Sequence, residues 1–166
     1  MICVFTSPIF ICLLKRMKRI KEINMSGFTM KEWIARSPKE VFEFITASEN
    51  APKVAPAIKS MVKLTDGPLR VGTKYLETRL MNGKEHQTEL EVIEYQPHQT
   101  YSVKNFTEGI EVIYQYTFHP ENNGTQVELV CTLKASGLKK LMLPIVSAVL
   151  QKEDGDHLKG LKKAME

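Results

Sequence analysis

The sequence predicts an α+β fold in which a curved, seven-stranded antiparallel sheet wraps on a long C-terminal helix. Three observations indicate this fold: a first strand that runs into a strong helix start, six β-favouring runs separated by turn residues, and an amphipathic pattern at the C-terminus. Two short helices are expected between the first two strands. At 166 residues the chain is one domain long and is able to bury about two thirds of its unfolded surface.

The first strand is predicted over residues 28–35, and a helix start follows it directly. Ser37 is a suitable N-cap, Pro38 suits the first helical position, and Glu40 completes a capping box. The helix is expected to end near Thr46, and a second short helix follows before the next strand.

The middle of the chain alternates β-favouring runs with turn residues. Asn82-Gly83 is the strongest hairpin signal, because both residues tolerate the positive φ of a two-residue turn. Neighbours joined by hairpins must be antiparallel. The alternation is apolar on one side and mixed on the other in several runs, which indicates a sheet covered on one face or curved around a cavity. The six strands are predicted at about 59–65, 73–81, 85–95, 100–108, 110–119 and 125–135.

The C-terminal segment, from about Leu138 to the end, is predicted to be one long helix with two apolar sides. At about 100° per residue, one stripe runs its whole length and is interpreted as the seam that packs on the sheet. A second set lies nearly opposite and occurs only in the first half, so we expect the cavity under Leu138 to Leu150. The stripe consists of Leu143, Leu150, Leu158, Leu161 and Met165, and the second set of Leu138, Leu141, Ile145, Ala148 and Val149.

Three residues interrupt the helical pattern. Pro144 lacks the N–H that a helix interior requires, so the helix is expected to start or kink there. Gly155 and Gly160 weaken the second half by about 1 kcal/mol each relative to alanine. We interpret them as tolerated surface glycines, and the alternative is a loosened helix that serves as a lid.

Residues 1–24 are expected to lie outside the domain, which we place at residues 25–166. An apolar run at 2–14 precedes a basic stretch, which is the reverse of the order in a secretory signal. The run is also shorter than the roughly 20 residues of a membrane span. We interpret the segment as untranslated sequence upstream of a start at Met25, and a short apolar anchor is the alternative.

The formal charge of +4 is carried by the N-terminal segment. Residues 25–166 hold 18 basic and 18 acidic side chains, so the domain has no net charge. Nucleic-acid binding needs a clustered basic face, and this class of partner is therefore excluded.

Cysteine and histidine patterns indicate a cytoplasmic domain without a metal or other cofactor. Cys131 is the one cysteine in the domain and is expected to be a small core hydrophobe, which suits a reducing compartment. The histidines have no paired ligand spacing, and no nucleophile motif or phosphate-binding loop is present in the sequence.

Several sequence phrases resemble the SRPBCC superfamily, which includes the START domains and the birch-pollen-allergen-like proteins, and within it the polyketide cyclase/dehydrase branch. The resemblance implies a helix-grip fold with a deep pocket between the sheet and the C-terminal helix. In different members this pocket holds lipids, sterols, polyketides, quinones or plant hormones. The matching phrases are SPKEVF at 37–42, VGT at 71–73, ETRLMNG at 77–83, EYQP at 94–97, YQYTF at 114–118, GTQV at 124–127 and EDGDHLKGLK at 153–162.

Candidate ligand-binding residues are those expected to face this pocket. Glu77 and Arg79 share a strand face and could orient a carboxylate or hydroxyl of a ligand, or else form a solvated ion pair outside. His86 is a possible general base, or an exposed residue beside a hairpin. Trp33 is expected either to line the pocket or to pack beneath the first helix. The full set is Trp33, Phe42, Tyr75, Glu77, Arg79, His86, Thr88, Asn105, Tyr114, Tyr116, Leu129, Met142, Ile145 and Val149.

The leading functional hypothesis is binding or transport of a hydrophobic small molecule, such as a lipid, polyketide, quinone or sterol-like compound, by a monomer or weak dimer. One alternative is a cyclase/dehydrase that uses Arg79, Tyr114 or His86 for acid-base chemistry. Another is an interaction module whose extra apolar helix face docks onto a protein or a membrane. Fold by itself does not decide between them.

Overall fold

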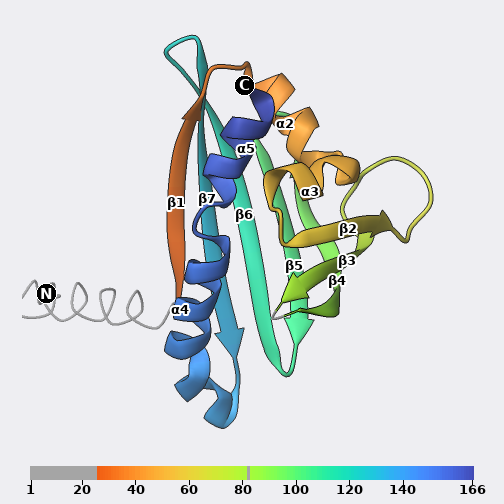
Figure 1. The fold of residues 1–166 in the computed structure, drawn as a ribbon, viewed down its shortest axis with the longest axis vertical. Coiled ribbons are helices and arrows are strands. Elements are labelled where there is room, and N and C mark those ends of the chain that lie inside the picture. Colours follow the sequence, from red (N-terminus) through yellow and green to blue (C-terminus); the bar gives the residue numbers. More distant parts are fainter. Residues whose placement is uncertain (1–25, 82) are drawn as a thin grey trace, which may run out of the picture.

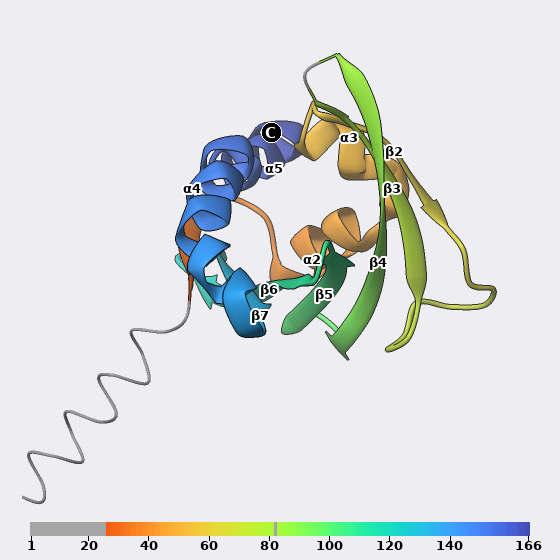
Figure 2. The same ribbon diagram turned by 90° about the horizontal axis from the view of Figure 1, so that it is seen from below.

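A curved seven-stranded sheet holds the C-terminal helices against its concave side (Figures 1 and 2). The computed structural model describes residues 26–81 and 83–166, so the proposed leader and the start at Met25 lie outside the described residues. The strands are β1 Ser26–Ile34, β2 Ile58–Lys63, β3 Lys74–Met81, β4 Lys84–Gln96, β5 Thr100–Thr107, β6 Ile110–Glu121 and β7 Gly124–Ala135. The predicted helix-grip architecture is confirmed.

Every neighbouring pair of strands is antiparallel, in the order β1-β7-β6-β5-β4-β3-β2. The first and last strands in sequence are therefore neighbours, and β1 and β2 form the two edges. β4 is the longest strand, and its pairing with β5 shifts register between Val92 and Glu94. Such a shift bends a strand and increases its twist, which helps the sheet to curve around the helices.

The short helices between β1 and β2 are α2 Pro38–Thr46, the 3₁₀ turn η1 Ser48–Asn50 and α3 Ala51–Val54. The predicted capping box starts α2: the Glu40 carboxylate accepts from the Ser37 backbone N–H at 2.9 Å, and the Ser37 hydroxyl accepts from the Glu40 backbone N–H at 3.4 Å. This helix buries Val41 and Phe42 against the sheet. The sequence predicted its first residue correctly because all the signals are local.

The C-terminal helical segment is divided into the 3₁₀ turn η2 Gly137–Met142, α4 Leu143–Asp154 and α5 His157–Met165. Pro144 lies in the first turn of α4, so the α-helix starts there, as expected. Gly155 lies between α4 and α5. None of the helices in the described residues is long and apolar enough to cross a membrane.

The interpretation of Gly160 as a tolerated surface glycine is wrong. A Cβ at this position would lie 2.0 Å from the backbone oxygen of Val54, so the absence of a side chain lets α5 approach α3. The contact joins residues more than a hundred positions apart, which no local pattern reveals.

Candidate ligand-binding cavity

A cavity of about 410 Å³ lies between the concave face of the sheet and the C-terminal helices, within the range of small-molecule sites. Figure 2 looks along the molecule from one end, with α4 and α5 facing β3 and β4 across the interior. Most of the wall is apolar. The apolar lining includes Ile58, Met61, Leu90, Val103, Val112, Leu129, Val146 and Leu150.

A polar network joins β3, β6 and α4 at the cavity wall. Arg79 donates from Nε to Glu77 Oε1 at 2.5 Å and from Nη1 to Asp154 Oδ1 at 2.7 Å. The Tyr114 hydroxyl donates to Asp154 Oδ2 at 2.6 Å. Both carboxylates are nearly inaccessible, with Glu77 6% and Asp154 5% exposed. Glu77 and Arg79 thus line the cavity, and the alternative of a solvated outer ion pair is wrong.

The network holds definite protonation states. Burial disfavours the charged guanidinium, but the adjacent Glu77 and Asp154 carboxylates hold the pKa of Arg79 above its usual range. Burial and the neighbouring Asp154 raise the pKa of Tyr114 well above its ordinary value. Arg79 therefore remains a cation, and Tyr114 remains a neutral hydrogen-bond donor, at all ordinary pH values.

A second polar pair lines the cavity next to this network. The Tyr116 hydroxyl and His157 Nε2 are 2.9 Å apart. Burial, together with the charge of Arg79, lowers the pKa of His157 to about 4, although Asp154 acts in the opposite direction. Burial also raises the pKa of Tyr116. His157 is consequently an uncharged imidazole at neutral pH.

Lowering the pH from about 7 to about 4.5 is expected to reduce the free energy of unfolding by about 2 kcal/mol through His157. The pKa of this imidazole is about 4 in the folded protein against an ordinary 6.5, so the unfolded chain takes up the proton first. The contribution is complete above about pH 6.5 and is lost as the pH falls toward 4. Urea unfolding of the wild type and of His157→Gln across this range measures it, and an identical pH dependence in the two proteins would contradict the prediction.

Nine of the predicted site residues line the cavity. His86, which faces Arg79 across the β3–β4 pair, is exposed and so lies at the solvent-facing rim. The nine are Tyr75, Glu77, Arg79, His86, Thr88, Asn105, Tyr114, Tyr116 and Leu129. Their binding roles remain predictions.

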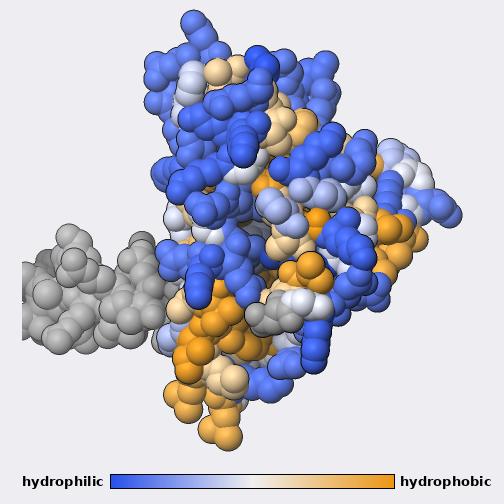
Figure 3. All heavy atoms as spheres, viewed as in Figure 1, coloured by the Kyte–Doolittle hydropathy of each residue, from blue (hydrophilic) through white to orange (hydrophobic). Residues whose placement is uncertain are grey.

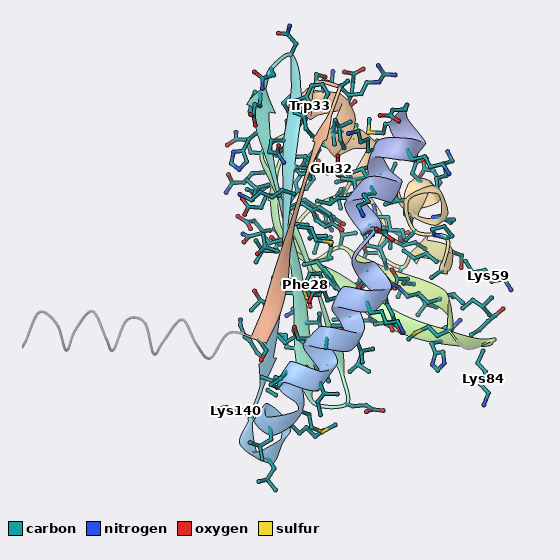
Figure 4. The ribbon with its side chains drawn as sticks, turned by 60° about the vertical axis from the view of Figure 1, so that its left-hand side comes forward. Phe28, Glu32, Trp33, Lys59, Lys84 and Lys140 are labelled. Carbon is teal, nitrogen blue, oxygen red and sulfur yellow. The ribbon has the colours of Figure 1, made fainter. Side chains whose placement is uncertain are left out.

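Two aromatic residues that were expected to line the cavity lie elsewhere. Trp33 donates from Nε1 to the Glu121 carbonyl at 3.0 Å, and its ring occupies the space where Gly124 has no side chain. It therefore packs on the β6–β7 turn. Figure 4 shows Trp33 at one end of β1 and Lys140 near the other end. Phe42 packs in the aromatic core, with its ring centroid 5.4 Å from that of Phe118. Neither residue contributes to the cavity wall.

The prediction that Met142, Ile145 and Val149 face the cavity is also wrong, because these helix residues face solvent. One face of α4 both packs on the sheet and covers the cavity. Val146 and Leu150 lie on this face and form part of the cavity wall. The opposite face is an exposed apolar patch, visible at the lower end of Figure 3, whose docking onto a protein or membrane stays a prediction. The patch comprises Leu138, Leu141, Met142, Ile145 and Val149, which are 49–85% exposed.

Sequence reasoning missed Asp154 and His157. A signal for them was present, because Asp154 follows Leu150 by four residues and His157 follows by seven, which places both on the buried stripe. A polar side chain on a buried stripe points to a site or a polar network. Within 26–81 and 83–166, no three His, Cys, Asp or Glu side chains gather as a metal site.

A sheet that grips a helix around a mostly apolar cavity defines the helix-grip class of domains. A family model described as "Polyketide cyclase / dehydrase and lipid transport" matches residues 25–166, so the chain belongs to this family. The resemblance predicted from the sequence is thereby confirmed. Comparison with curated proteins finds no match.

Solved structures share the fold at low sequence identity. Ara h 8.0201 has a TM-score of 0.68 at 20% identity, covering 85% of this chain and 97% of its own. TTHA0849 from Thermus thermophilus has a TM-score of 0.68 at 18% identity, covering 84% and 96%. The di-domain ARO/CYC StfQ from the steffimycin biosynthetic pathway has a TM-score of 0.70 at 14% identity, covering 93% of this chain and 55% of its own.

Proposed function

We propose that the protein binds and carries a hydrophobic small molecule, of lipid, polyketide, quinone or sterol-like character, in the cavity beneath α4. The observation that carries the proposal is a cavity of about 410 Å³, open to solvent at its rim, whose wall is mostly apolar and holds two groups of hydrogen-bonded polar side chains, the Arg79 network and the Tyr116–His157 pair. A few placed polar groups in an apolar pocket orient a ligand while burial of its skeleton supplies most of the affinity.

The apolar wall supports an occupant. Its side chains include Leu90, Val112 and Leu129, and the cavity is open to solvent at its rim. Covering such apolar surface with a hydrophobic ligand is favourable in proportion to the area that is removed from water.

Substitution of Val146 by tryptophan is expected to weaken binding of the uncharged dye Nile red at least tenfold, because the indole occupies the cavity. Ile145→Trp is the matched control: it introduces the same side chain at the preceding helix position, which is 66% exposed and lies outside the cavity lining. Dye fluorescence titrations measure both affinities, and circular dichroism checks folding. Absence of dye binding to the wild type, or equal loss in both variants, would refute the proposal.

A cyclase or dehydrase is the second candidate, and one observation favours it. An uncharged imidazole, His157, lies in the same cavity as the Arg79 guanidinium, which suits proton abstraction next to a carbonyl and stabilisation of the resulting oxyanion. In this version His157 takes the role first given to the exposed His86. The candidate requires a ligand that is chemically altered on incubation with the protein, and loss of that turnover in folded Arg79→Ala.

A further inference from the structure

The charges at the cavity wall are predominantly negative. Among the described residues that line it, four carboxylates face a single permanent cation, Arg79. Two of these, Glu77 and Asp154, belong to the buried network, and the other two, Glu108 and Glu153, are exposed at the rim. The His157 imidazole is uncharged at neutral pH. Lys139 contacts the Glu108 backbone carbonyl and is not part of the lining.

Arg79 is already neutralised by its protein partners. One carboxylate accepts from Nε and a second from Nη1, so the buried network carries a net charge of −1. A guanidinium has five N–H donors, and the two contacts to Glu77 and Asp154 leave others for a neutral acceptor. A ligand carboxylate would instead place a third negative charge beside two buried ones, where water screens little.

We infer that the cavity accepts hydrophobic molecules with an uncharged hydroxyl or keto head group and rejects the corresponding carboxylates. This inference rests on the proposed function and deepens it by specifying the ligand's polar end. A hydroxyl both accepts from Arg79 and donates to a network carboxylate, and a keto oxygen accepts from the N–H groups of Arg79 that Glu77 and Asp154 do not use. The sequence led us to expect that Glu77 and Arg79 orient either a carboxylate or a hydroxyl of the ligand. The negative charge of the cavity wall favours the hydroxyl.

The test is displacement of Nile red by 1-decanol and by decanoic acid at neutral pH and low ionic strength. These molecules share a chain length and differ at the head group. Decanol is expected to displace the dye at a concentration at least tenfold lower than decanoic acid. Equal or better displacement by the acid overturns the inference while leaving the proposed function intact. If Nile red does not bind the wild type at all, the proposed function falls, and the inference falls with it.

A variant that lacks the two rim carboxylates tests whether the charge of the cavity causes the preference for the alcohol over the acid. Glu108→Gln combined with Glu153→Gln is expected to reduce the acid-to-alcohol ratio of displacing concentrations at least threefold, because two carboxylates at the rim are removed. The matched control, Glu111→Gln with Glu128→Gln, removes the same charge from residues that lie outside the cavity lining and pair with Lys134 and Lys31. An unchanged ratio in the first variant, or an equal change in the control, overturns the inference.

Discussion

Replacement of Arg79 by leucine is expected to lower the free energy of unfolding at neutral pH by about 3–5 kcal/mol. The substitution leaves Glu77 and Asp154 as charged groups that are 6% and 5% exposed and have lost their cation. Urea unfolding monitored by circular dichroism at neutral pH measures the effect.

The control for this prediction is Lys74→Leu on the same strand. Lys74 pairs with Glu89 at 2.7 Å, but both side chains are about half exposed, and solvent screens such pairs. Little change is expected in that variant. Equal stability of Arg79→Leu and Lys74→Leu at neutral pH would show that the buried network does not depend on the Arg79 charge.

The second large effect is expected from Gly160→Val, at about 3 kcal/mol of destabilisation. In an exposed helix the removal of a glycine normally stabilises, since alanine is favoured over glycine by about 1 kcal/mol. Here the new Cβ would meet the backbone oxygen of Val54 at 2.0 Å, and backbone cannot rotate away as a side chain can. The helix α5 must therefore move away from α3.

Thermal or urea unfolding of Gly160→Val, Gly160→Ala and Lys159→Val separates the causes. Lys159→Val adds the same β-branched residue at the neighbouring exposed position and should change little. Gly160→Ala should also destabilise, in spite of its better helix propensity. A stabilised Gly160→Ala protein would mean that α5 and α3 separate without cost.

Local signals in the sequence were enough to predict most of the secondary structure. The capping box at Ser37–Glu40 places the start of α2, and the turn residues between strands place all six later strands to within a few residues. Pro144 marks the start of α4. Each of these signals acts over four residues or fewer, so the sequence around it contains all the chemistry that decides the outcome.

The residues of the cavity wall could not all be predicted, because no local sequence pattern determines them. An apolar stripe predicts that one face of the helix is buried, but it does not tell whether that face packs on other side chains or covers a cavity. For this reason Ile145 and Val149 were predicted to line the cavity, whereas Val146 and Leu150 do so. The environment of Trp33 was undetermined for the same reason, because its partner turn lies 88 residues away.

Propensity, turn chemistry and periodicity agree along the chain, and this agreement is why the amino-acid order is enough to specify a seven-stranded antiparallel sheet with its short helices and C-terminal helix. The meeting of Arg79 with Asp154, 75 residues away, and the place of this pair in the cavity follow from the folded arrangement alone. The direction of the Arg79 side chain depends on the curvature of the sheet, which results from packing between distant segments.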